Sequence, residues 1–324
     1  MFTKTFKQLS YKDVGEAGGK GASLGEMSSV KLPVPSGFVV LAKAFDRFLE
    51  ETDLEVEIVA LLKKVNYKDI NSVDKASNVI RDLIHDKAMP NDIKKEILIE
   101  FKKLKTQTPL NPPLSGGKFY VAVRSSATAE DSSVASWAGE LETYLDTTEK
   151  NLLDNVRKCW SSLFTPRAIF YRQEKKMLKT KVSVAVVIQN MIESEISGIA
   201  FTVHPVTRDK NQMIIEAGWG LGEAIVSGQV TPDAYVIDKR DLSIIDINIA
   251  KQEMMIIRKA GGGIKHTIVP KLKQEKQKLS GKQIIELAKM CANIEKHYKK
   301  PQDIEWAYAK GKFYITQSRP ITTL

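Results

Sequence analysis

The segment DIEWAYAKGKFYITQSRP, residues 303–320, decides the fold, because it carries two runs of alternating residues on either side of a turn near Gly311. Successive side chains of a strand point to opposite faces, so Asp303 and Glu305 lie on one face of the first run. Polar and apolar residues alternate in this way on both sides of a glycine-containing turn. The segment therefore predicts a β-hairpin.

Gln317 and Arg319 share one face of the second run by the same alternation. They converge with Asp303 and Glu305 only if odd-numbered residues pair with odd-numbered residues. Such a register predicts a connection of odd length, three or five residues including Gly311. A carboxylate facing an amide oxygen offers hard ligands for Mg²⁺, and an arginine beside them suits a phosphate. The alternative is a surface ion pair between Arg319 and one of the two carboxylates.

The residues that precede the hairpin alternate between helical and strand-like patterns. Apolar residues at helical spacing predict helices within residues 43–107 and again within 152–163. Ser280 and Gln283 form a capping-box pattern that begins another helix. Short runs rich in β-branched residues predict strands at 119–123, 182–188, 198–203, 213–216 and 235–237.

Two motifs have the chemistry of phosphate binding. In GGKGASLGEM, residues 18–27, the glycines let backbone N–H groups approach a phosphate, and Lys20 can supply a positive charge. The motif is not a Walker A loop, and a glycine-rich turn before a helix also needs no ligand. In VAVRSSATAED, residues 121–131, a strand delivers Arg124 at its end, where α/β enzymes place ligands.

The composition narrows the class of protein. The chain has 324 residues, two cysteines and no apolar leader or membrane-length apolar run, so we expect a cytoplasmic enzyme or binding domain without a membrane partner. Its net charge is +10, but residues 251–300 alone hold 13 Lys or Arg against 4 Asp or Glu. Few aromatic residues accompany these lysines, so we interpret them as a solvated face rather than a nucleic-acid site.

Taken together, the motifs resemble the N-terminal ATP-binding domain shared by phosphoenolpyruvate synthase, pyruvate phosphate dikinase and rifampicin phosphotransferase. The resemblance runs through VPSGFVV, VRSSATAEDSSVASWAGELETYL, SGIAFTVHPVT, EAGWGLGEAIVSGQVTPDAYVID, DIEWAY and ITQSRPIT. It implies an α+β, ATP-grasp-like fold of two lobes with mixed or antiparallel sheets and helices, which bind ATP between them. We assign residues 1–195 to the first lobe and residues 196–324 to the second.

The resemblance also implies roles for matched residues. Lys20, Arg124 and Arg319 correspond to cationic phosphate-binding and catalytic positions, and Glu305 and Gln317 to the Mg²⁺ ligands. The remaining matched positions contact the nucleotide: Gly139 and Thr143 over the phosphates, Gln189 and Met191 beside the adenine, and Asp303 as an acidic residue of the hairpin motif.

In the family that the chain resembles, ATP donates a pyrophosphoryl group to a histidine on a swivelling domain, and a further domain binds pyruvate or phosphoenolpyruvate. The chain ends at SRPITTL, where the family's linker begins, so we expect these two domains to act in trans or to lie outside this chain. His266 follows glycines but precedes the hairpin, which favours an exposed turn histidine over a phosphate acceptor. The alternatives are an inactive nucleotide-binding module and a rifampicin phosphotransferase-like domain.

Overall fold

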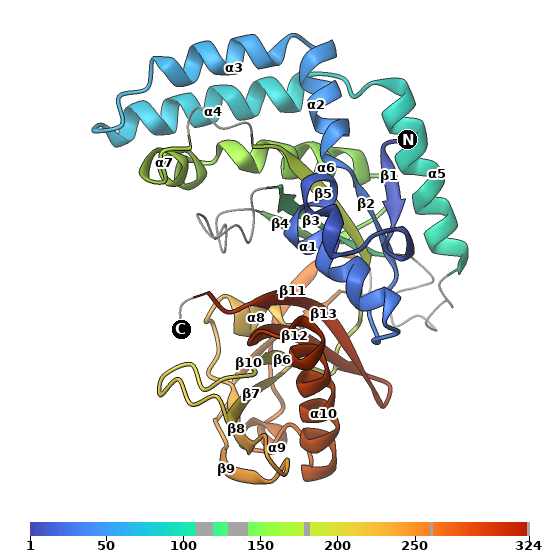
Figure 1. Ribbon diagram of the computed structural model, residues 1–324, viewed down its shortest axis with the longest axis vertical. Coiled ribbons are helices and arrows are strands. Elements are labelled where there is room, and N and C mark those ends of the chain that lie inside the picture. The colour runs from blue at the N-terminus through green and yellow to red at the C-terminus, as the bar shows by residue number, and fades with distance from the viewer. Residues whose placement is uncertain (108–118, 129–141, 178–181, 260–261, 323–324) are drawn as a thin grey trace. The chain divides into compact units, whose positions relative to one another are not determined.

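The computed structural model describes residues 1–107, 119–128, 142–177, 182–259 and 262–322, and it combines helices with antiparallel sheets in an α+β fold (Figure 1). The described residues form two compact units. Of the described residues, the first unit contains 1–29, 36–107, 119–128, 142–177 and 182–191, and the second contains 30–35, 192–259 and 262–322. The division into functional lobes after residue 195 stays a prediction.

A five-stranded antiparallel sheet forms the centre of the first unit. Its strand order is β1–β2–β5–β3–β4, so β4 is an edge strand. The strands are β1 (Thr3–Thr5), β2 (Gly37–Val40), β3 (Val121–Ala127), β4 (Thr143–Thr147) and β5 (Val184–Asn190). Strand β3 continues through Arg124, because β4 and β5 pair with it on both sides; the expectation that Arg124 ends the strand is wrong. Gln189 likewise lies within β5 rather than after it.

Helices cover one face of this sheet. The predicted helical region 43–107 resolves into four helices, and the region 152–163 into a helix followed by a 3₁₀ turn. The odd-numbered side chains of β3 enter the core between helices and sheet, where Trp160 packs against Phe45 and Phe48 with ring centroids 5.6 and 5.1 Å away. The helical elements are α2 (Ala42–Glu51), α3 (Leu54–Lys63), α4 (Ile70–Asp86), α5 (Asn91–Gln107), α6 (Leu152–Ser161), η3 (Ser162–Phe164) and α7 (Pro166–Glu174).

Helix α1 (Val14–Ser29), after the short 3₁₀ turns η1 (Phe6–Gln8) and η2 (Tyr11–Asp13), contacts β3 and β5. Gly18 interrupts it with φ 68°, so the glycine-rich turn before a helix is confirmed. A Cβ atom at Gly18 would lie 2.2 Å from the Ser126 Oγ and 2.3 Å from its carbonyl oxygen. Since Gly21 N also donates to Ser126 Oγ at 3.3 Å, the glycines let this turn dock on the even-numbered residues of β3.

The second unit is built on a six-stranded antiparallel sheet. Its order is β13–β12–β6–β7–β8–β9. The apolar stripe of α10 (Gly281–Tyr298) is buried, and the helix begins with the expected capping box of Ser280 and Gln283. The strands are β6 (Ile196–Phe201), β7 (Gln212–Trp219), β8 (Asp233–Asp238), β9 (Ile244–Asn248), β12 (Gln302–Ala309) and β13 (Lys312–Pro320). The remaining elements are α8 (Glu223–Val226), α9 (Lys271–Gln274) and the hairpin of β10 (Met254–Arg258) with β11 (Ile264–Ile268).

The C-terminal hairpin corrects one expectation and confirms another. Odd-numbered residues do pair, Asp303 with Arg319 and Glu305 with Gln317, but the predicted connection of odd length is wrong. The turn has two residues, Lys310 and Gly311, both with positive φ, as a type I′ turn requires. A β-bulge shifts the register, because Glu305 pairs with Gln317 whereas Trp306 pairs with Ile315, so the ladder skips Thr316.

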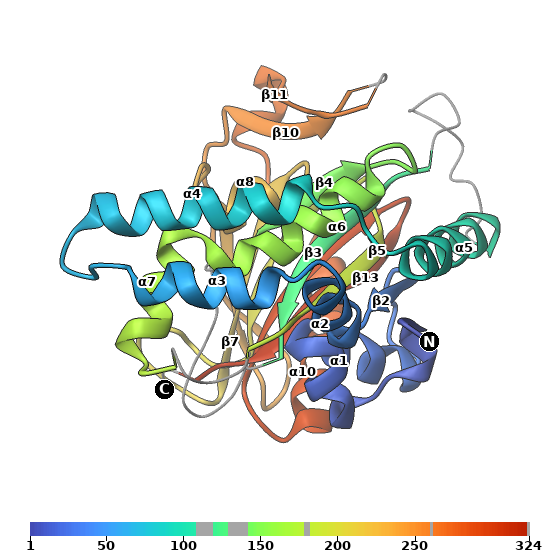
Figure 2. The ribbon, with the colours of Figure 1, turned by 90° about the horizontal axis from the view of Figure 1, so that it is seen from above.

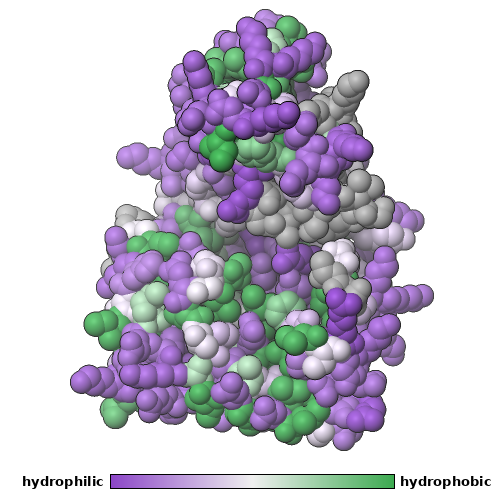
Figure 3. All heavy atoms as spheres, turned by 90° about the vertical axis from the view of Figure 1, so that its left-hand side faces the viewer, coloured by the Kyte–Doolittle hydropathy of each residue, from purple (hydrophilic) through white to green (hydrophobic). Residues whose placement is uncertain are grey.

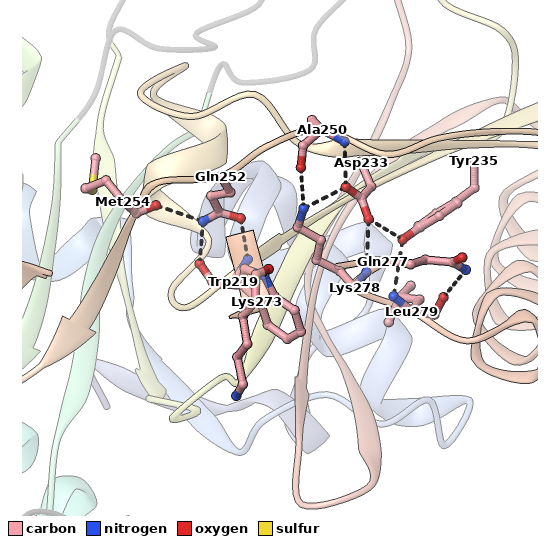
Figure 4. A network of polar contacts seen from close by, with 10 residues as sticks. All are labelled: Trp219, Asp233, Tyr235, Ala250, Gln252, Met254, Lys273, Gln277, Lys278 and Leu279. Carbon is pink, nitrogen blue, oxygen red and sulfur yellow. Dashed lines mark hydrogen bonds and ion pairs between the residues drawn. The ribbon is translucent and has the colours of Figure 1, made fainter. Parts of the chain in front are cut away.

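A buried polar network holds the segment after β9 against β8 (Figure 4). The Lys278 Nζ donates to Asp233 Oδ1 at 2.8 Å and to the Ala250 carbonyl at 2.7 Å. Asp233 Oδ2 accepts from the Tyr235 hydroxyl and from Lys278 N, at 2.8 and 2.9 Å. The side chains of Lys278 and Asp233 are both 0% exposed.

Lys278 and Arg258 depart from the interpretation of residues 251–300 as a solvated face, because their side chains are 0% and 9% exposed. Every other lysine among the described residues of this range is exposed. On the face drawn in Figure 3, hydrophilic and hydrophobic residues are interspersed. The sequence pattern could not separate Lys278 from its neighbours, because burial of a lysine depends on the distant Asp233.

Candidate functional site

Arg124 and Gln189 meet on one face of the first unit's sheet. Their side chains are 9% and 3% exposed, and Arg124 Nη1 donates to Gln189 Oε1 at 3.4 Å. The Gln189 Nε2 is buried and has no hydrogen-bond partner among the described residues. An unpaired buried amide costs about 1–3 kcal/mol, so a ligand atom that accepts this hydrogen bond would recover that energy. The pair thus fits a ligand with a negative group and a nitrogen or oxygen acceptor.

Thr143 lies directly opposite Arg124 in the β3–β4 ladder. Directly paired residues of an antiparallel sheet project to the same face, so Thr143, Arg124 and Gln189 share a face with the Gly18 turn of α1. The predicted loop residue Gly139 lies outside the described residues.

Lys20 lies on α1, the helix that contacts β3 and β5. Burial raises the pKa of the Cys159 thiol, Glu142 raises it further, and the Lys20 ammonium lowers it. The Cys159 Sγ contacts the Val123 carbonyl oxygen at 3.6 Å. Lys20 is thus carried by a helix that contacts β3, the strand of Arg124. Met191, just beyond β5, is 8% exposed, and its N–H donates to the Tyr120 carbonyl at 3.2 Å.

In the second unit, the hairpin brings together all four side chains that the sequence selected. Arg319 Nε and Nη2 both donate to Asp303 Oδ2, at 2.9 and 2.7 Å. Burial raises the pKa of Asp303, Arg319 opposes that rise, and the charge of Glu305 adds to it. The predicted ion pair with Arg319 thus forms with Asp303, and Glu305 faces Gln317 across the ladder.

Glu216 belongs to this face although the sequence analysis did not select it. Ile199 pairs with Glu305 on one side and with Glu216 on the other, so the two carboxylates project to one face with one strand between them. Burial raises the pKa of Glu216, and the nearby charge of Asp303 raises it further. A single carboxylate in the otherwise apolar run of β7 was the signal that could have identified it.

The hairpin offers only part of a coordination shell, so it suits a cation whose remaining ligands are waters and substrate phosphates. Among the described residues, no three His, Cys, Asp or Glu side chains form a ready-made metal site. Mg²⁺ typically takes one or two protein carboxylates together with waters and substrate phosphates. Glu305 and Gln317 supply one carboxylate and one amide oxygen at paired positions, which fits that requirement.

The structure describes the surroundings of two of the histidines. His204 Nδ1 accepts from Val206 N and Thr207 N, both at 3.2 Å, so it stabilises a turn. His266 is exposed but lies in β11, so its assignment to a turn is wrong.

None of the described helices combines the length and apolar character that crossing a lipid bilayer requires.

Comparisons with known proteins agree with these features. A model of the family described as "Pyruvate phosphate dikinase, AMP/ATP-binding domain" matches residues 14–324. The chain is 47% identical to a probable phosphoenolpyruvate synthase of Methanocaldococcus jannaschii, covering 100% of this chain and 27% of that protein. It is 42% identical to the phosphoenolpyruvate synthase of Pyrococcus furiosus, covering 100% and 44%.

A third relative is named for a different activity. The chain is 38% identical to the rifampicin phosphotransferase of Bacillus subtilis, covering 95% of this chain and 34% of that protein. The chain therefore spans less than half the length of each of these relatives.

Proposed function

Because the chain belongs to the pyruvate phosphate dikinase AMP/ATP-binding domain family, we propose that it binds Mg-ATP and transfers a phosphoryl or pyrophosphoryl group to a histidine of a separate domain. The observation that carries the proposal is the hairpin register, which pairs Glu305 with Gln317 and Asp303 with Arg319. One ribbon thus supplies oxygen ligands for Mg²⁺ and a guanidinium for phosphate.

The first unit binds the rest of the nucleotide in this proposal. Lys20, Arg124, Gly139 and Thr143 contact the phosphates, while Gln189 and Met191 lie beside the adenine. The free amide hydrogen of Gln189 supports this assignment, since the adenine ring offers nitrogen acceptors.

Positioning and charge neutralisation provide the catalysis. Phosphoryl transfer spreads negative charge over phosphate oxygens, and it needs little covalent chemistry from the protein. Lys20, Arg124 and Arg319 hold those oxygens, and Glu305 and Gln317 hold the Mg²⁺, which neutralises phosphate charge when bound. The other side chains orient the nucleotide for the incoming acceptor.

Two partner domains complete the activity. Each relative is longer than this chain, which supports further domains in the complete proteins. We propose a swivelling domain with the acceptor histidine and a domain that binds pyruvate and phosphoenolpyruvate. The rifampicin phosphotransferase relative supports a second candidate, in which the final acceptor is rifampicin.

Calorimetric titration of the chain with ATP, with and without Mg²⁺, tests the binding step. We expect Mg-ATP to bind, and Glu305→Gln to remove most of the Mg²⁺ dependence. A histidine domain from one of the relatives, incubated with the chain and with β-labelled ATP, should become labelled on histidine. Binding without transfer would support an inactive nucleotide-binding module, and absence of binding would refute the proposal.

A further inference from the structure

The start of strand β4 depends on contacts outside the sheet. Among the described strands, β4 pairs only with β3, and a register irregularity interrupts that pairing between Val121 and Val123. An edge strand of five residues with an irregular ladder is prone to fraying at its ends. Thr143 is the first residue of this strand, so its position depends on what holds Glu142.

The backbone of Glu142 is fixed to β3. Its carbonyl oxygen accepts from Ser125 N at 3.2 Å and from Ser125 Oγ at 2.6 Å. The Cys159 Sγ lies 3.9 Å from the same oxygen. These contacts join Glu142 to the residue that follows Arg124.

The side chain of Glu142 is fixed to the helical layer. Arg81 Nη2, on α4, donates to Glu142 Oε1 and Oε2 at 2.9 and 3.0 Å. The Tyr144 hydroxyl donates to Glu142 Oε2. The Arg81 and Glu142 side chains are 23% and 30% exposed, so solvent screens this pair less than a surface pair. Figure 2 shows α4 alongside α6 on the helical side of the unit, and α6 in turn contacts β4.

Consecutive side chains at the start of β4 point alternately to the helical layer and to the opposite face of the sheet. Glu142 and Tyr144 lie one residue to either side of Thr143, so they project toward the helices while Thr143 projects to the face of Arg124. Holding Glu142 and Tyr144 from the helical side therefore limits how far Thr143 can move on the other side.

We propose that Arg81 and Glu142 are positioning residues, which act through the β4 backbone to set Thr143 opposite Arg124 for contact with the nucleotide phosphates. The inference rests on the proposed ATP site and extends it to the helical layer. It assigns α4 a role in ligand binding, although Arg81 itself touches no phosphate. Its physical basis is preorganisation, because a strand end that is already ordered costs less conformational entropy when the ligand binds.

The test compares ATP with AMP. Both share the adenosine part, but only ATP carries the β- and γ-phosphates. Arg81→Met and Glu142→Gln should each weaken Mg-ATP binding by about tenfold, equivalent to about 1.4 kcal/mol, while the Kd for AMP changes by less than about twofold. Arg81→Lys keeps the charge without the two-oxygen contact, so its Kd for ATP should lie between those of the wild type and Arg81→Met.

Arg47→Met is the matched control. Arg47 lies on α2 in the same helical layer and pairs with Glu51 and Asp92, neither of which belongs to β4. It should leave both Kd values unchanged. Thermal melts of all variants identify any that fail to fold, and Glu142→Gln preserves side-chain volume if Arg81→Met is unstable.

Equal weakening of ATP and AMP binding, or no weakening by either folded variant, would overturn the positioning role. If the wild-type chain bound ATP normally in that case, only this inference would fail. If the wild-type chain did not bind ATP at all, the proposed function would fail and the positioning role with it.

Discussion

Replacement of Lys278 by Met tests the buried network of the second unit. The substitution removes the ammonium that donates to Asp233 Oδ1 at 2.8 Å and to the Ala250 carbonyl at 2.7 Å. The Asp233 carboxylate would stay buried without a counter-charge, because both side chains are 0% exposed. Removing one partner of a buried ion pair typically costs about 3–5 kcal/mol. We expect a loss in this range.

The substitution Asp233→Leu should destabilise the chain more than Lys278→Met does. Asp233 also accepts from Ala250 N at 3.0 Å, from Lys278 N at 2.9 Å and from the Tyr235 hydroxyl at 2.8 Å. Asp233→Leu would leave these donors unpaired, at about 1–3 kcal/mol for each neutral donor that finds no water, and would leave the Lys278 ammonium buried without its counter-charge. The double variant with Lys278→Met should therefore not return to wild-type stability, although apolar replacement of buried ion pairs is often neutral.

Hydrogen exchange is the appropriate assay, because a chain of two units does not guarantee a single unfolding transition. Peptides from β8 and from residues 250–280 should lose protection in Lys278→Met, while peptides from β3 and β5 keep it. Lys276→Met is the control: Lys276 is exposed in the same segment, and its replacement should change stability by less than about 0.5 kcal/mol. A Lys278→Met chain as protected as this control would refute the reasoning.

Three further predictions concern the candidate site. Gly18→Ala should lower the melting temperature and weaken ATP binding, because a Cβ there would meet Ser126 Oγ at 2.2 Å with the backbone at positive φ; a wild-type melting curve would contradict it. Glu305→Gln should weaken ATP binding by about tenfold with Mg²⁺ present but leave it nearly unchanged in EDTA, by calorimetry. Burial and the charge of Asp303 raise the pKa of folded Glu216 above its unfolded value, so the folded state binds this proton more tightly and the carboxylate destabilises the chain once pH exceeds the unfolded pKa. Glu216→Gln should therefore raise the melting temperature at pH 8 more than at pH 4, and equal shifts at both values would argue against it.

The C-terminal hairpin shows how far alternation carries a prediction. Strand residues alternate with a period of two, so the shared face of Asp303 and Glu305 followed from the sequence. The pairing of odd with odd residues was also correct, but it results from a bulge at Thr316 rather than from a turn of odd length. The local sequence pattern does not mark where a bulge occurs. Whether a bulge is tolerated depends on how the whole sheet packs.

Contacts between distant residues were the main features that the sequence analysis missed. Arg81 and Glu142 are 61 positions apart, and Lys278 and Asp233 are 45 positions apart. Each residue looks like an ordinary surface charge in its own segment. Glu216 was missed for a related reason, since its proximity to Glu305 depends on Ile199 of the strand between them.

The sequence by itself indicated the main helical regions and several strands, pointed to the family, and predicted candidate residues for phosphate and metal chemistry, because propensity, periodicity and motif spacing are local properties of the chain. Only the tertiary structure decided which charges are buried, which strand lies at an edge, and which helix holds the start of β4. These properties depend on burial and on sheet order, which arise from the packing of segments that are far apart along the chain.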